Sequence, residues 1–136
     1  MKTLKNARKA LIVLTCTASS LAIGTAESAP PNIAPADAKN HIGEVATVCG
    51  KVVDTKINKY GIRDHGKPVL FDLDQPEPNP VFYFVTFGTK DGGPEEAIAA
   101  YNGKKVCVTG KISEASGRPY IMAADRTTIK PIATTN

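Results

Sequence analysis

The chain contains five runs rich in β-branched and aromatic residues, separated by clusters of Gly, Pro and Asp. This pattern is typical of a strand-rich domain. Gly50 lies in the middle of the first run, where it predicts a bulge or bend that lets a long strand curve around a small barrel. The last run predicts a strand that is interrupted near Ala124 and Asp125. The predicted strands cover residues 44–56, 69–74, 81–88, 104–112 and 119–132.

One helix is predicted between the third and fourth strands. Pro94 suits a first helical position, Glu95 and Glu96 suit the positive amino-terminal end, and Gly103 can end the helix. Three strands, a helix and two more strands is the order of an OB-fold, a five-stranded Greek-key barrel. We therefore predict an all-β fold with one short helix over residues 41–132, followed by a tail at 133–136. Another small antiparallel barrel or sandwich is the alternative.

Three segments carry a resemblance to a known group of proteins. They read HIGEVATVCGKVVDTK at 41–56, GKPVLFDLDQPEPNPVFYFVTFG at 66–88 and GKKVCVTGKISEASGRPYIMAADRTTI at 103–129. Together they resemble small exported bacterial OB-fold proteins that are described as nucleic-acid-binding-like. The resemblance implies the OB-fold for nearly the whole chain after the amino-terminal leader. It also implies a binding function, and the description of the group as nucleic-acid-binding-like largely reflects its fold.

The amino terminus has the order of a secretory signal peptide. Basic residues at 2–9 precede an apolar run at 10–26, and small residues and prolines follow. A transmembrane anchor is the alternative, but Thr and Ser interrupt the apolar run and make it a weak span. We predict a signal peptide at 1–26, a flexible lead-in at 27–40 with a short helix at 35–40, and export to the periplasm or the exterior without stable membrane insertion.

Removal of the signal peptide changes the charge of the protein. The whole chain has 17 basic and 13 acidic residues, a formal net charge of +4, and four of the basic residues lie in the leader. The remaining chain then has 17 − 4 = 13 basic and 13 acidic residues, so its net charge is near zero. The basic character of the whole chain is therefore no indication of affinity for nucleic acid.

Two cysteines occur in similar contexts, VCGKV at 48–52 and VCVTGKI at 106–112. The first and fourth strands of an OB-fold are neighbours, and the alternation of each strand places Cys49 and Cys107 on one face. In an oxidising compartment this predicts a disulfide. Two buried free thiols are the alternative. A metal or redox site is less favoured, because His41 and His65 lack ligand spacing to the cysteines and there is no CxxC motif.

The predicted ligand site lies over strands two and three, where OB-folds bind their ligands. The loop region at 51–67 is locally basic and contains a tyrosine, and the loop before the last strand adds an arginine and a second tyrosine. Aromatic rings of strand three also reach the outer face: Phe82 and Phe84 in one phase, Tyr83 and Phe87 in the other. The candidate binding residues are Lys56, Lys59, Tyr60, Arg63, Lys67, Tyr83, Phe87, Arg118 and Tyr120.

Basic loops beside aromatic rings indicate capture of single-stranded nucleic acid or another anionic ligand. A protein-interaction or envelope-structural role on the same aromatic face is the alternative, and OB-folds also bind oligosaccharides. Asp72 and Asp74 would repel phosphates on this face. No nucleophile, metal-ligand or phosphate-loop motif is present. The two aspartates are better explained as keeping a strand face hydrated and discouraging edge-to-edge pairing. We predict no catalytic residue, metal or cofactor.

Overall fold

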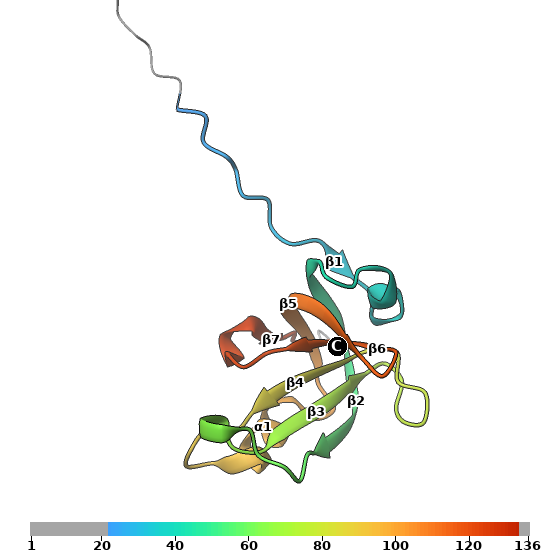
Figure 1. Ribbon diagram of the computed structural model, residues 1–136, viewed down its shortest axis with the longest axis vertical. Coiled ribbons are helices and arrows are strands. Elements are labelled where there is room, and N and C mark those ends of the chain that lie inside the picture. The colour runs from blue at the N-terminus through green and yellow to red at the C-terminus, as the bar shows by residue number, and fades with distance from the viewer. Residues whose placement is uncertain (1–21, 134–136) are drawn as a thin grey trace, which may run out of the picture.

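The computed structural model describes residues 22–133 and is mostly β-sheet with one short α-helix (Figure 1). The predicted all-β character with one short helix is confirmed, but in residues 22–133 four strands precede that helix and three follow it, instead of the predicted three and two. The strands are β1 (Asn32–Ile33), β2 (Val45–Ile57), β3 (Pro68–Leu73), β4 (Tyr83–Phe87), β5 (Lys105–Ala115), β6 (Arg118–Met122) and β7 (Ile129–Pro131). The helix is α1 (Gly93–Tyr101), and three short 3-10 helices are η1 (Pro35–Asn40), η2 (Arg63–His65) and η3 (Arg126–Thr128).

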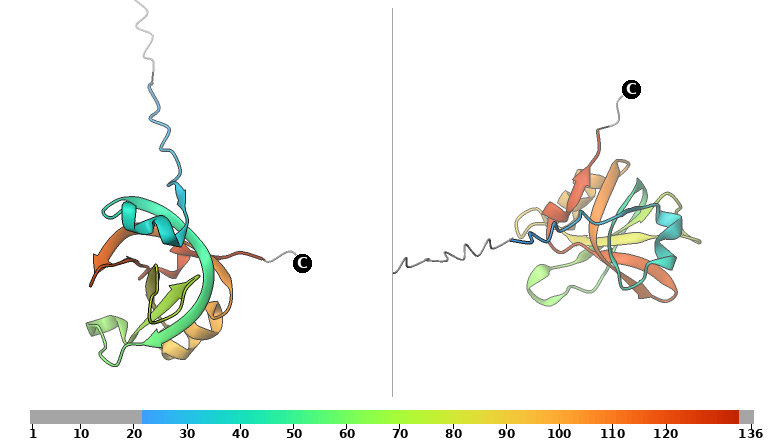
Figure 2. Two further views of the ribbon diagram at one scale, coloured as in Figure 1. Left: turned by 90° about the vertical axis from the view of Figure 1, so that its right-hand side faces the viewer. Right: turned by 90° about the horizontal axis from the view of Figure 1, so that it is seen from above.

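Five strands pair in a closed ring, β2 with β3, β4, β6, β5 and back to β2. Only the pairing of β4 with β6 within this ring is parallel. The 13-residue strand β2 closes the ring because its first half pairs with β5 and its second half with β3, with a register shift between Val52 and Asp54. Figure 2, left, shows β2 curving around the molecule. The result is a barrel-like sheet, to which β1 and β7 are added as short extra strands.

The core fills the inside of this ring. Inward positions alternate along each strand, and Phe71, Phe82 and Phe84 are fully buried there, with Phe71 and Phe84 stacked at 4.8 Å between ring centroids. Ala97 and Tyr101 of α1 pack on the same cluster, and the Tyr101 ring meets Phe71 edge-on. Helix α1 therefore closes one end of the ring, opposite the end near η1 (Figure 2).

The disulfide between Cys49 and Cys107 is confirmed. The two residues lie directly opposite each other in the antiparallel pairing of β2 with β5, and their sulfur atoms are bonded. The repeated cysteine context of the sequence therefore corresponds to two neighbouring strands that are covalently joined.

The segment before the barrel differs from the predicted flexible lead-in. From Asn32 onward it packs on the barrel, because β1 pairs with β2 and the Thr47 amide donates to the Pro31 carbonyl at 2.9 Å. Helix η1 has the predicted bounds, and its Pro35 and Ala38 are buried. Ala38 belongs to the core cluster, so apolar burial holds this segment in place.

Gly50 allows the barrel to receive η1. A Cβ at this position would lie 2.9 Å from both the Pro35 Cγ and the Asp74 Oδ1 atoms. The sequence predicted a bend at Gly50, whereas the register shift of β2 falls later, between Val52 and Asp54. The close approach of η1 and of Asp74 is the physical reason for a glycine here.

Gly50→Ala is expected to lower the free energy of unfolding by about 1–3 kcal/mol, because η1 and Asp74 must shift to admit the methyl group. Urea unfolding followed by circular dichroism measures the change. Lys111→Ala, an exposed substitution on the neighbouring strand β5, is the control. Equal stability of the two variants would contradict the packing explanation.

The predicted signal peptide at 1–26 lies for the most part outside the described residues, as does most of the predicted tail at 133–136. Within residues 22–133, no helix is long and apolar enough to span a membrane.

Candidate binding face

The outer face of β4 is formed by Tyr83, Val85 and Phe87, which alternate with the inward Phe82 and Phe84. The structure thus selects the second of the two phases that the sequence allowed. Val85 and Phe87 are buried but do not belong to the core cluster, and the Phe87 ring lies against His65 of η2. We call this outer surface, with its neighbours on β3 and β6, the β4 face.

Two rows of side chains cross the β4 face. In one row, strand pairing places Asp54, Asp72, Tyr83, Tyr120 and Ser113 side by side on five strands. The Tyr83 and Tyr120 rings are stacked, with centroids 5.2 Å apart and planes 12° apart. In the next row, Lys56, Leu70, Val85 and Met122 are neighbours, and Met122 is 46% exposed. The face therefore combines an aromatic pair with apolar and charged neighbours.

A cleft of about 220 Å³, the Tyr83 cleft, lies at the beginning of β4. Two cations and two carboxylates line it, and the Arg118 Nη1 atom donates to the Glu77 Oε1 atom at 2.8 Å. Both partners of this ion pair are more than 40% exposed, so the pair positions Arg118 more than it stabilises the fold. The lining residues are Lys56, Leu70, Asp72, Glu77, Tyr83, Ala115, Ser116 and Arg118.

Asp72 is the most perturbed acid of this cleft. Burial, together with the negative charges of Glu77 and Asp54, raises the pKa of the Asp72 carboxyl to about 6. Arg118 and Lys56 act in the opposite direction and lower it. The charge of the cleft therefore changes at mildly acidic pH, where Asp72 takes up a proton.

A second cavity, of about 430 Å³, lies at the other end of β4 and is called here the Phe87 cavity. The His65 ring covers Phe87, with 5.1 Å between the ring centroids, and leaves Phe87 only 6% exposed. Phe87 was predicted to offer a stacking surface, but the exposed ring at this place belongs to His65. The lining residues are Asp64, His65, Gly66, Lys67, Phe87, Gly88, Thr89, Lys90, Gly93, Pro94, Ala124 and Arg126.

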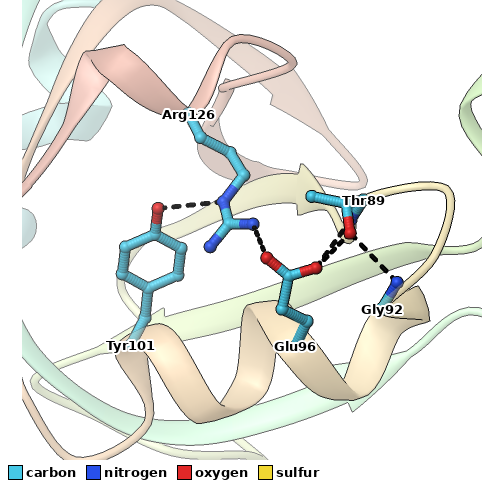
Figure 3. Close-up of polar contacts among 5 residues, drawn as sticks. All are labelled: Thr89, Gly92, Glu96, Tyr101 and Arg126. Carbon is cyan, nitrogen blue, oxygen red and sulfur yellow. Dashed lines mark hydrogen bonds and ion pairs between the residues drawn. The ribbon is translucent and has the colours of Figure 1, made fainter.

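A polar network fixes one wall of the Phe87 cavity (Figure 3). The Arg126 Nε atom donates to the Tyr101 hydroxyl at 3.2 Å, and its Nη1 atom donates to the Glu96 Oε1 atom at 2.8 Å. The Thr89 hydroxyl donates to the other Glu96 oxygen and accepts from the Gly92 amide at 3.0 Å. The hydrogen bonds from Thr89 and then from Arg126 lower the pKa of Glu96. The network joins the loop after β4, helix α1 and η3.

The structure brings some of the predicted site residues together and separates others. Lys56, Tyr83 and Arg118 line the Tyr83 cleft, and Tyr120 stacks on Tyr83. Two more, Lys67 and Phe87, line the Phe87 cavity. The remaining three, Lys59, Tyr60 and Arg63, lie in the exposed segment after β2 and line neither space.

Sequence reasoning missed Glu77, His65, Lys90 and Arg126 as residues of these sites. Glu77 meets Arg118 across 41 positions of the chain, and no local pattern shows such a pairing. His65 was considered only as a metal ligand. The locally acidic character of residues 72–96 was the one available signal for Glu77. Among residues 22–133, no group of three or more His, Cys, Asp or Glu side chains could hold a metal ion.

Few known proteins resemble this chain. No family model matches the chain, and no curated protein matches it. One similar solved structure is a crystal structure of a protein assigned as an aspartyl-tRNA synthetase from Leishmania major Friedlin, with 11% sequence identity and a TM-score of 0.49. The similarity covers 83% of this chain and 23% of that chain. It is too low to indicate a shared function.

Proposed function

We propose that the protein is an exported OB-fold binding module that captures single-stranded nucleic acid or another anionic ligand on the β4 face without catalysis. The fold assignment is supported by the closed ring of five strands and by the place of α1, between the third and fourth strands of that ring. Export is supported by the signal-peptide pattern of the sequence and by a disulfide, which persists in oxidising compartments.

The observation that carries the proposal is the stacked pair Tyr83 and Tyr120, beside a cleft lined by Lys56 and Arg118. Both rings are partly exposed, so a base can stack on them, and every base has a π-face. The cations attract a phosphate backbone that runs past the rings. Binding in this description is non-covalent, with stacking and charge neutralisation as its two contributions.

A protein partner is the second candidate, and one feature of the cleft favours it. Glu77 neutralises Arg118, and Asp72 adds negative charge above about pH 6, so the cleft carries little excess positive charge. Next to it, Leu70 and the 46% exposed Met122 form an apolar row. An apolar surface with a polar rim is the ordinary composition of a protein interface.

Fluorescence anisotropy of a labelled single-stranded oligonucleotide tests the proposal. We expect saturable binding that weakens as salt increases, because bound cations are released. Tyr83→Ala should weaken binding roughly 5- to 100-fold, the range expected for loss of one stacking ring. The double variant Lys56→Ala with Arg118→Ala should weaken binding and flatten its salt dependence.

The matched control is Lys111→Ala with Lys130→Ala, which removes two exposed lysines that line neither cavity. It should bind as the unmodified protein does. Absence of oligonucleotide binding at low salt would contradict the nucleic-acid proposal. Salt-independent binding of a protein partner that is lost in Met122→Asp would support the second candidate instead.

A further inference from the structure

The Phe87 cavity is more cationic than the Tyr83 cleft. Its charged lining consists of Lys67, Lys90 and Arg126 against Asp64, and the Glu96 carboxylate pairs with Arg126 in the wall, so one positive charge is in excess. The Tyr83 cleft pairs two cations with two carboxylates. Its volume of about 430 Å³ is within the range of small-molecule sites. The charge and the size together indicate a small anionic ligand.

Arg126 is held in a fixed position in the wall of this cavity. Its Nε and Nη1 atoms donate to Tyr101 and Glu96, and its guanidinium carbon lies 5.4 Å from the centre of the Tyr101 ring. Its hydrogen bonds to described residues use Nε and Nη1, which leaves Nη2 for a ligand (Figure 3). A guanidinium that is already ordered loses less freedom when it binds an anion. Because Thr89 also donates to Glu96, the negative charge of Glu96 is shared between two partners.

The cavity also offers a flat apolar surface. The exposed His65 ring lies over Phe87, tilted by 33°, and Pro94 adds an apolar wall. An aromatic ring backed by a second ring is a suitable platform for a planar heterocycle. Lys67 follows His65 by two positions, so a cation and the platform come from one short segment.

We propose that the Phe87 cavity binds a nucleoside monophosphate group, with the base against His65 and the phosphate near Lys67, Lys90 and Arg126. The group is either a free mononucleotide or the phosphorylated end of a strand that lies on the β4 face. Only the strand-end form rests on the proposed function. The shared chemistry is a phosphate monoester next to a planar base.

Isothermal titration calorimetry with adenosine monophosphate, adenosine and inorganic phosphate tests this proposal on the purified protein with its disulfide intact. We expect adenosine monophosphate to bind at least about 10-fold more tightly than either fragment, because both contacts contribute to its affinity. Lys67→Ala with Lys90→Ala should weaken its binding about 10-fold or more, and the control pair Lys111→Ala with Lys130→Ala should not. His65→Ala should weaken adenosine monophosphate and leave phosphate unchanged. No binding of adenosine monophosphate, or binding unchanged in Lys67→Ala with Lys90→Ala, would overturn the proposal.

Two labelled oligonucleotides, identical except for a terminal phosphate, separate the two sources. A gain in affinity from the phosphate that disappears in Lys67→Ala with Lys90→Ala identifies the strand end. No gain, with adenosine monophosphate still bound, identifies the free mononucleotide. If adenosine monophosphate binds and neither oligonucleotide does, the nucleic-acid function fails and the cavity assignment stands. If the oligonucleotides bind through Tyr83 and adenosine monophosphate does not bind, the nucleic-acid function stands and the cavity assignment fails.

Discussion

Replacing both Cys49 and Cys107 with serine is expected to lower the free energy of unfolding by about 4 kcal/mol. The disulfide joins residues 58 positions apart, so it removes many conformations from the unfolded chain. The small domain depends on the disulfide for stability because its single core buries limited apolar area. A loss of this size is comparable with the whole stability of many domains.

Urea unfolding of the oxidised protein, the reduced protein and the double serine variant measures this effect. The reduced protein and the variant should unfold at nearly the same urea concentration, because both lack the same bond. The single variant Cys49→Ser separates loss of the bond from the cost of a free thiol at position 107. Equal stability of oxidised and reduced protein would contradict a structural role for the disulfide.

Asp72→Asn is expected to raise the free energy of unfolding by about 2 kcal/mol at neutral pH, because it removes a buried charge without changing the shape of the side chain. The free energy of unfolding rises, rather than falls, because the pKa of Asp72 is raised in the folded protein. The folded protein holds this proton up to about pH 6, whereas the unfolded chain releases it near about pH 4. The folded state therefore binds more protons in this window, and the stability of the unmodified protein falls as pH rises through it.

The same substitution should strengthen oligonucleotide binding at neutral pH about 3- to 10-fold, because a negative charge next to the phosphates is removed. The unmodified protein should gain affinity as the pH falls below about 6, and Asp72→Asn should lose this dependence. Asp37→Asn, an exposed carboxylate on η1, is the control for a general change in charge. Identical pH dependence of binding in the unmodified protein and in Asp72→Asn would contradict the role of Asp72.

The sequence predicts the strands and the helix well because each depends on a local pattern, and it predicts the disulfide once the expected strand order makes the two strands neighbours. Pro94, Glu95 and Gly103 define the helix through backbone and dipole chemistry that does not need the rest of the fold. Alternation along β2 and β5 places the two cysteines on one face before their pairing is known. Tyr83 was found as one of two possible strand phases and Tyr120 from its place after a loop, and the structure stacks the two rings.

The sequence does not predict features that depend on packing between distant segments. Docking of η1 on the barrel depends on space left by Gly50, and covering of Phe87 depends on the course of the loop that carries His65. The partnership of Arg126 with Tyr101 and Glu96 joins elements 25 and 30 positions apart. Such contacts follow from tertiary structure, which local propensity does not specify.

The measurement that tests the binding face most directly is a titration of the isotope-labelled protein with a single-stranded oligonucleotide, followed through its backbone amide NMR signals. We expect the largest shifts at Tyr83, Tyr120 and Arg118, whereas the signals of β7 and of the strand pair around Cys107 should stay in place. Shifts concentrated instead on the segment that contains Lys59 and Arg63, or no shifts at low salt, would contradict the assignment of the β4 face as the nucleic-acid site.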